Sequence, residues 1–362
     1  MIYIVVFLIS LFFIAKASII ECNSKDKRFY IVLSTVLPIL LAAFRGNLIG
    51  VDMDAYFLPW AQNVKHYNSF TLFCNNNADS MEYLYYALIF YPVKFTNSLF
   101  LSLLVQQVLI MYGVIKMLFY FKDKYDIDVV FGFAIYLLLF YNESLCIMRQ
   151  SIAVSFAFLS MINYTEKRYV SFLIMSIIAF FFHHSIISFT LIFLIYDYLD
   201  KLISNIRIKL VLITVIIFVF SSLSTIFEVL SVINISERFV ERLSGAEEND
   251  GGFKTIAMYA ILVFIPYLLF LFRKNKYEYK SIWFYPVLGF VLVVLAKQSV
   301  YLGRLAYPFM GLVIITLPSV LSKNKILKYF IVLMLAAFWY YTNVMMDTWG
   351  TNNYYMDRGL NF

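Results

Sequence analysis

Long apolar runs recur along the whole chain and are separated by short polar or charged segments. A membrane-spanning helix needs roughly 20 mostly apolar residues, and about twelve runs approach that length. The first run lacks a basic start and a cleavage-like site, so we interpret it as a retained span. The pattern predicts an all-α integral membrane protein with about 12 transmembrane helices. We expect these spans near residues 1–20, 29–44, 97–121, 129–141, 149–163, 169–182, 184–199, 210–228, 255–272, 281–297, 301–320 and 326–346.

The composition excludes most other classes of protein. Of the 362 residues, 62% are hydrophobic and 14% are charged, whereas a soluble domain is about half apolar and about a quarter charged. These values exclude a soluble enzyme, a nucleic-acid-binding module and a disordered protein. Three cysteines are too few for a disulfide scaffold.

The basic residues gather in short clusters between apolar runs, as at residues 25–28, 122–124 and 167–168. All of these clusters can face one side of the membrane, and the positive-inside rule makes that side the cytoplasm. Membrane anchoring accounts for the clusters, so none is a candidate site. With twelve spans, both termini then lie outside.

Two outer segments, at about residues 45–80 and 229–253, are long, and an outer tail follows at 347–362. Residues 82–95 are too few to span at 1.5 Å per residue, which predicts an interfacial helix that ends at Pro92. No repeat and no domain boundary is visible, so we expect residues 1–362 to form a single polytopic membrane domain.

Helical rise converts sequence distance into depth in the membrane. His183 follows Arg168 by 15 residues, or about 22 Å, within a hydrocarbon core about 30 Å thick. A turn at that depth must line a cavity or be buried in protein. The same arithmetic places Arg45, Arg149, Lys297 and Arg304 near one outer level.

Ionisable groups at such a depth usually face a polar cavity, so we expect a basic cavity that opens outward. Two alternatives stay open: each cation extends separately to the outer interface, or the histidines are hydrogen-bonded structural residues. An arginine fork suits phosphate, and neighbouring acids can bind sugars or accept a proton. Asp52-Met53-Asp54 has a D-x-D pattern that can hold a divalent cation. Nucleotide sugars are absent outside the cell, so we favour loop carboxylates and expect neither a metal nor a cofactor.

An ordered set of motifs carries a resemblance that covers about residues 1–345. Residues 45–56 read R-G-x-x-x-G-x-D-x-x-x-Y, and Glu82 opens the next helix. Residues 148–153 read M-R-Q-S-I-A, residues 182–185 read F-H-H-S, and residues 303–307 read G-R-L-A-Y. The set resembles the EpsG-like family of bacterial exopolysaccharide and O-antigen polymerases of the Wzy type.

The resemblance implies a GT-C-like fold in the bacterial inner membrane, with an active site that faces the periplasm. It implies undecaprenyl-pyrophosphate-linked oligosaccharides as donor and acceptor, with membrane lipid around them. The glycan on one carrier would move to the terminal sugar hydroxyl of a second lipid-linked repeat unit. A chain-length regulator protein stays open as a partner, and nucleic acid is not expected.

We assign roles to the candidate residues on this basis. His183 is the expected base, with Asp52 as its competitor, because a histidine titrates near neutral pH. Arg149, Arg45 and Arg304 are expected to stabilise the pyrophosphate leaving group. The remaining candidates are expected to bind substrate, position sugars or orient the arginines: Tyr56, Glu82, Asn142, Gln150, Asp54, His184 and Lys297.

Two rival functions stay open. An O-antigen ligase or another GT-C glycosyltransferase would share the cavity but use lipid A or a protein as acceptor. A flippase or transporter of lipid-linked glycans would need polar residues along a path through both leaflets. Here the polar groups gather in the outer half of the spans, which favours the polymerase.

Overall fold

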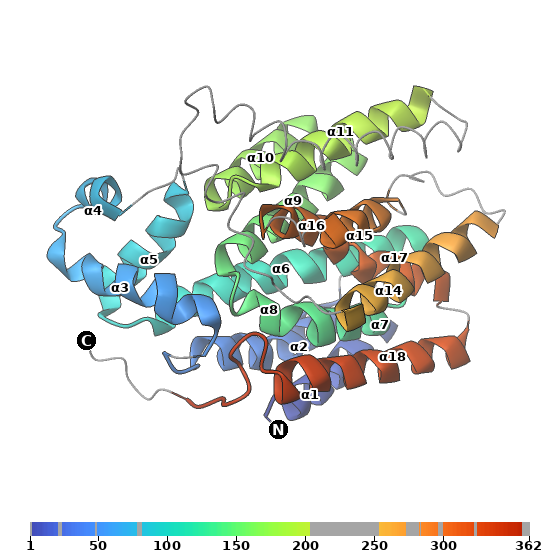
Figure 1. Ribbon diagram of the computed structural model, residues 1–362, viewed down its shortest axis with the longest axis horizontal. Helices are drawn as coiled ribbons and strands as arrows, with labels where there is room; N and C mark the ends of the chain where they lie inside the picture. The colour runs from blue at the N-terminus through green and yellow to red at the C-terminus, as the bar shows by residue number, and fades with distance from the viewer. Residues whose placement is uncertain are drawn as a thin grey trace. The chain divides into compact units, whose positions relative to one another are not determined.

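A computed structural model describes residues 2–20, 24–47, 49–77, 82–202, 253–272, 282, 284–295, 300–321 and 324–356. In these ranges the regular structure is helical, apart from one isolated bridge between Arg45 and Met356 (Figure 1). The all-α prediction is therefore confirmed for the described part of the chain.

Each predicted span coincides with a helix, except 210–228, which lies outside the described residues together with most of the predicted outer loop 229–253. Among the residues that the structure describes, four helices are long and apolar enough to cross a membrane: Ile2–Ile19, Phe100–Tyr125, Gly303–Leu321 and Lys325–Met345. The chain is thus a membrane protein, and the count of about 12 spans stays a prediction.

The chain divides into two compact units, residues Met1–Ile186 with Leu321–Phe362, and residues Ile187–Val320. The prediction of a single domain is not tested by this division. The helices of the first unit are α1 (Ile2–Ile19), α2 (Lys25–Ala43), η1 (Met53–Phe57), α3 (Leu58–Asn63), η2 (Val64–His66), α4 (Phe70–Asn77), α5 (Tyr83–Thr96), α6 (Phe100–Tyr125), α7 (Val129–Ile135), η3 (Tyr136–Phe140), α8 (Tyr141–Ser144), α9 (Met148–Thr165), α10 (Tyr169–Phe182), α18 (Lys325–Tyr340) and η5 (Tyr341–Met345).

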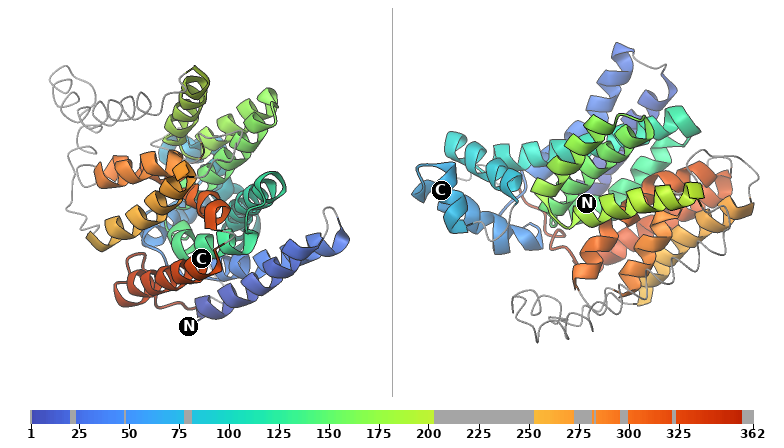
Figure 2. Two further views of the ribbon diagram at one scale, coloured as in Figure 1. Left: turned by 90° about the vertical axis from the view of Figure 1, so that its right-hand side faces the viewer. Right: turned by 90° about the horizontal axis from the view of Figure 1, so that it is seen from above.

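Helix α9 packs against α6 and α10 (Figures 1 and 2). Small residues line both contacts. A Cβ atom on Gly113 of α6 would lie 2.6 Å from the side chain of Ser155, so only glycine permits this approach. On the other side, the hydroxyls of Ser160 and Ser176 lie 2.7 Å apart. Close packing of small residues is the usual way in which helices associate within lipid. It places the start of α9 beside the end of α10.

The hairpin of α1 and α2, blue in Figure 2, packs on α6 and α7. Asp128 caps the start of α7 by accepting from the Phe131 amide, and it also pairs with Lys328 of α18 at 2.6 Å. Further along α18, Trp339 packs on the rings of Tyr3 and Phe7. These contacts join the two ends of the chain within the first unit.

The segment at residues 45–80 was expected as a loop, but most of its described residues are helical, in η1, α3, η2 and α4. Pro59 lies in the first turn of α3, where a proline needs no hydrogen-bond partner for its nitrogen. The proline therefore belongs to the start of a helix and does not interrupt it.

The prediction that the interfacial helix ends at Pro92 was wrong, because α5 continues to Thr96. A proline inside a helix deprives the carbonyl four residues earlier of its donor. Here that carbonyl belongs to Leu88, and the hydroxyl of Ser102 donates to it at 2.6 Å. The hydroxyl replaces the missing bond, which lets the helix pass through the proline.

The second unit contains most of α11 (Ile186–Leu202), with α14 (Phe253–Phe272), α15 (Tyr285–Leu295), α16 (Val300–Gly311) and α17 (Val313–Leu321). Its core is aromatic: the ring of Phe189 packs on Phe309, and the Tyr285 hydroxyl donates to the Phe193 carbonyl at 3.1 Å.

Candidate active site

Three helix ends meet at the carboxylate of Glu82, which is only 1% exposed. Glu82 directly precedes α5, Arg149 lies in the first turn of α9, and His183 directly follows α10. Nη1 of Arg149 donates to Oε2 of Glu82 at 2.6 Å, and Nδ1 of His183 lies 2.5 Å from Oε1. One buried carboxylate therefore holds two of the residues that the sequence predicts for catalysis.

His184 completes this group, which we call the Glu82 cluster: Glu82, Arg149, His183 and His184. Its Nδ1 lies 3.5 Å from Oε1 of Glu82, and its ring stacks on that of His183 with centroids 5.8 Å apart. Its side chain is 46% exposed, whereas the side chain of Arg149 is 23% exposed. The cluster is thus buried at its acid and accessible at His184 and Arg149.

The charge state of Glu82 follows from its surroundings. Burial acts to raise the pKa of this carboxyl, but the hydrogen bond from His183 and the charges of His183, Arg149 and His184 together lower the pKa to about 2. The acid is therefore ionised at neutral pH. The sequence predicts a basic cavity, and the structure places a compensating anion at the centre of the cationic groups.

Aromatic rings surround the guanidinium of Arg149. Its carbon Cζ lies 5.2 Å from the ring centroid of Trp60 and 5.8 Å from the centroids of Tyr56 and Tyr85. A cation within about 6 Å of a ring is attracted by the negative face of that ring. The direct bond to Glu82 fixes the direction of Arg149, and the rings enclose its guanidinium.

The influences on the pKa of Tyr85 show which other charges lie near its hydroxyl. Burial is the largest influence on its pKa and raises it, and the charges of Arg149, Asp52, Arg45 and Glu82 act on the same hydroxyl. The structure therefore gathers four of the predicted site residues around one phenol of α5.

Arg45 makes its direct contacts away from the Glu82 cluster. Its guanidinium is buried, donates to the Leu145 carbonyl at 2.8 Å, and contacts the sulfur atoms of Met53 and Met148. In this position it joins the segment after α2 to the start of α9. Its predicted contact with pyrophosphate stays a prediction.

The tail at residues 347–356 holds the segment that carries Arg45 and Asp52. The amide of Gly46 donates to the Tyr355 carbonyl at 3.0 Å, and the amide of Gly50 donates to the Gly350 carbonyl at 3.1 Å. A Cβ atom on Gly46 would lie 1.8 Å from the Tyr355 ring, so the ring occupies the space that a side chain would need. The tail thus acts as a strap over this segment.

Asn142 belongs to the same support. Its amide donates to the Thr351 hydroxyl at 2.9 Å, and its carbonyl accepts from the Trp339 indole at 2.9 Å. Both partners lie near the end of the chain, and Asn142 is buried. Its contacts in this structure link α8 to α18 and to the strap, and its predicted contact with sugars stays a prediction.

The remaining candidates are not members of the Glu82 cluster, and one of them lies outside the described ranges. Gln150 is buried beside Arg149 on α9, and Asp54 is exposed on η1. Arg304 is exposed on α16 in the second unit, and Lys297 lies outside the described residues. Among the residues that the structure describes, no group of three or more His, Cys, Asp or Glu side chains could hold a metal ion.

Sequence reasoning understated Glu82 and missed Trp60. Glu82 was expected to position sugars or orient an arginine, and the structure makes it the centre of the cluster. The available signal was an acid at the start of an apolar helix, since a buried carboxylate must be paired. Trp60 gave no comparable signal, because a lone tryptophan near the membrane also suits the interface belt.

Comparison with known proteins agrees with the motif order. A family model described as the EpsG family matches residues 28–356 of the chain. No curated protein and no solved structure matches the chain.

Proposed function

The chain belongs to the EpsG family, and on that premise we propose that it polymerises lipid-linked glycans at the periplasmic face of a bacterial inner membrane. The donor is a glycan on undecaprenyl pyrophosphate, and the acceptor is the terminal sugar hydroxyl of a second lipid-linked repeat unit. A GT-C-type arrangement with about twelve spans and both termini outside is part of this proposal. The positive-inside distribution of Lys and Arg supports the orientation.

The contact between His183 and Glu82 carries the proposal. Because the Glu82 carboxylate is ionised, it accepts a hydrogen bond and Nδ1 of His183 donates it. In the neutral imidazole the other nitrogen, Nε2, is then the acceptor, which is the form that a general base requires. Glu82 also stabilises the imidazolium that forms when Nε2 takes a proton, as the acid does in a Ser-His-Asp triad.

The transfer then proceeds in one displacement. Nε2 of His183 removes the proton of the acceptor hydroxyl, and the hydroxyl oxygen forms a bond to the anomeric carbon of the donor. The bond between that carbon and the pyrophosphate oxygen breaks, and undecaprenyl pyrophosphate leaves with the electron pair. Asp52 is the alternative base, because its charge lies near the same group of residues.

Arg149 is the first candidate to bind the leaving group. A guanidinium has five N–H donors, and the bond to Glu82 uses Nη1. Arg149 is partly exposed, so its other N–H groups are available to phosphate oxygens. These donors are in position before negative charge develops on the leaving group. Arg45, Arg304 and Lys297 are the further cations of this proposal.

Replacement of His183 by Ala in cells tests the function. We expect surface glycan to fall to a single repeat unit on its lipid anchor, while the protein stays in the membrane at normal amounts. His66→Ala is the matched control, because His66 is exposed on η2 and lies outside the Glu82 cluster. Normal long chains in both the His183→Ala and Arg149→Ala variants would contradict the assignment.

The same assay separates the nearest rival. Loss of an O-antigen ligase would accumulate finished polymer on undecaprenyl pyrophosphate, because polymerisation would still occur. Loss of the polymerase accumulates single units. Gel analysis of the lipid-linked glycans distinguishes the two outcomes.

A further inference from the structure

Two of the rings around Arg149 are accessible from outside the protein. Tyr56 is 44% exposed and Trp60 is half-buried, whereas Tyr85 and Tyr86 behind them are buried. The Trp60 ring packs edge-on against Tyr86, with centroids 5.2 Å apart, and lies 5.9 Å from the ring of Tyr56. The pair therefore forms an aromatic surface that packs on buried rings on one side and is exposed on the other.

Local backbone structure brings these two rings together. Tyr56 lies in the π-helical turn η1, and Trp60 lies four residues later in α3. The amide of Leu58 donates to the Met53 carbonyl, which is the bond five residues apart that defines such a turn. Single π-helical turns occur frequently at functional sites because they redirect side chains.

We propose that Tyr56 and Trp60 form the subsite that binds the sugar rings of the lipid-linked glycan. A sugar ring has an apolar face of C–H groups and a polar edge of hydroxyls. The apolar face fits an aromatic ring, which supplies a large and rigid contact area. The hydroxyls at the edge reach the polar groups of the Glu82 cluster. The inference rests on the proposed function, since it assigns the glycan to that same site.

The surroundings favour a sugar over a lipid chain. Both rings share the guanidinium of Arg149, which bonds directly to the ionised Glu82. A hydrocarbon chain on this surface would desolvate those charges without giving them any hydrogen bond. Sugar hydroxyls supply such bonds, so an amphipathic ligand matches the two kinds of group that the surface offers.

The plain alternative is that the rings anchor the protein at the membrane interface, where Tyr and Trp are common. Tyr83 provides a matched control for that role. It is 46% exposed, lies next to Glu82 in the chain, and is not among the rings that face Arg149. Anchoring alone predicts similar effects for Tyr83 and Trp60, whereas a sugar subsite predicts different effects.

The experiment uses the full chain in lipid nanodiscs and two probes. The first probe is the repeat-unit oligosaccharide released from its lipid, and the second is undecaprenyl pyrophosphate without sugar. We expect Trp60→Ala to weaken binding of the oligosaccharide about tenfold, the change that corresponds to about 1.4 kcal/mol. Binding of undecaprenyl pyrophosphate should stay as in the wild type. Trp60→Phe, which retains a ring, should recover most of the lost affinity, and Tyr83→Ala should have no effect.

In the polymerisation assay, Trp60→Ala should raise KM for the lipid-linked repeat unit while kcat changes little, because the lost contact is made before and during the reaction. Unchanged oligosaccharide binding in Trp60→Ala would overturn the inference. Equal losses in Trp60→Ala and Tyr83→Ala would also overturn it, in favour of anchoring. Normal long chains in both His183→Ala and Arg149→Ala would refute the proposed function instead, and the oligosaccharide measurement would still decide the subsite.

Discussion

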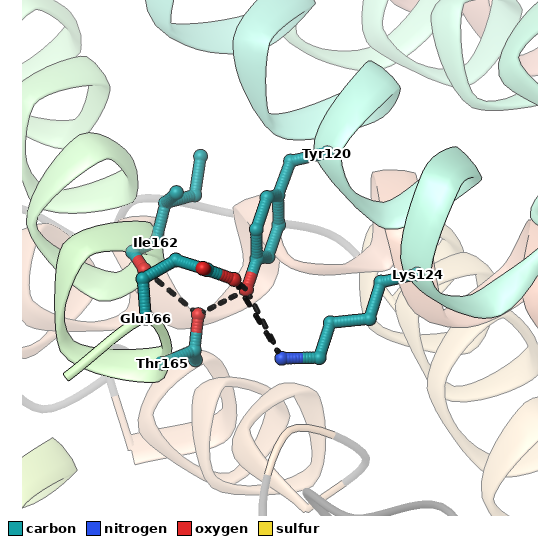
Figure 3. Close-up of polar contacts among 5 residues, drawn as sticks. All are labelled: Tyr120, Lys124, Ile162, Thr165 and Glu166. Carbon is teal, nitrogen blue, oxygen red and sulfur yellow. Dashed lines mark hydrogen bonds and ion pairs between the residues drawn. The ribbon is translucent and has the colours of Figure 1, made fainter.

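A polar cluster lies at each end of helix α9, and the two clusters differ in burial. At its start, Arg149 meets Glu82 and His183. At its end, Thr165 and the following Glu166 meet Tyr120 and Lys124 of α6 (Figure 3). The 18 residues of α9 separate the clusters by about 25 Å. Both clusters combine an acid with a cation, but they lie in different environments.

The second group, which we call the Tyr120 cluster, consists of Tyr120, Lys124, Thr165 and Glu166. Figure 3 draws the contacts of these side chains. The Tyr120 hydroxyl lies 2.5 Å from that of Thr165 and donates to Glu166 at 2.7 Å. Nζ of Lys124 lies 3.9 Å from Oε1 of Glu166, and the Glu166 side chain is 39% exposed. Water screens this ion pair, so it contributes about 0–1 kcal/mol.

The Glu82 cluster differs because its acid is out of reach of water. Loss of one partner there would leave a buried charge uncompensated, which costs about 3–5 kcal/mol. The comparison teaches that burial, and not residue type, separates a cluster suited to chemistry from one that joins two helices. A buried carboxylate can orient a histidine and support its positive charge, whereas an exposed one is already satisfied by solvent.

The largest expected effect is that of Glu82→Gln. The amide keeps the shape of the side chain but removes the negative charge that pairs with Arg149 and His183. We expect loss of polymerisation and a destabilisation of about 3–5 kcal/mol, measured by thermal unfolding of the protein in detergent. Glu166→Gln at the other end of α9 is the matched control and should change neither property. Equal effects of the two substitutions would remove the distinction between the clusters.

Acid titration sharpens the same contrast. The pKa of Glu82 is lowered from its ordinary value to about 2, so its stabilising effect is fully present above the ordinary glutamate pKa of about 4.3. That effect is lost as the pH falls from about 4 towards 2. The difference in melting temperature between the wild type and Glu82→Gln should therefore shrink over this range. A constant difference would show that the charge of Glu82 does not cause it.

An intermediate effect is expected at Gly46, under the strap. A Cβ atom at this position would overlap the Tyr355 ring, which must then move. We expect Gly46→Ala to cost about 1–3 kcal/mol, as overpacking does, and to shorten the glycan chains, because the segment carries Arg45 and Asp52. The double variant Gly46→Ala/Tyr355→Ala should recover chain length, since the clash is gone. Persistent short chains in the double variant would mean that the strap does not act through this contact.

The smallest effect is expected at the Tyr120 cluster. Tyr120→Phe removes the hydroxyl that bonds Thr165 and Glu166, which corresponds to about 0.5–1.5 kcal/mol. Chain length should stay normal, because these residues lie at the end of α9 away from Glu82. Thermal unfolding and gel analysis of the glycan measure the two quantities. Short chains in Tyr120→Phe would show that this cluster also contributes to the reaction.

The helices themselves were largely predictable from the chain. The apolar run predicted at 169–182 is the helix α10 with the same bounds, and most other runs agree within a few residues. Such agreement is expected, because lipid requires each span to satisfy its own backbone hydrogen bonds. The errors fall where a distant group intervenes. Pro92 continues a helix only because Ser102 bonds the Leu88 carbonyl, and no local pattern contains that contact.

The candidate site was predictable in its members but not in its connections. Motif order indicated Asp52 and Tyr56, and motif order together with depth indicated Arg149 and His183, because these two lie at the ends of predicted spans. That Glu82 joins Arg149 and His183 was not visible, since these partners are 67 and 101 residues away along the chain. Sequence distance does not limit such pairs, which form when separate helices pack.

The sequence by itself thus determined that this chain is an α-helical membrane protein with ionisable residues near the ends of its predicted spans, because apolar length and local charge suffice for that. Only the tertiary structure decided which of those charges are buried and neutralised by neighbouring side chains and which are exposed to solvent. Burial depends on neighbours from other helices: α5, α9 and α10 enclose Glu82, whereas the end of α9 leaves Glu166 in reach of solvent. A carboxylate at each end of α9 therefore serves a different purpose, and the packing of neighbouring helices decides which.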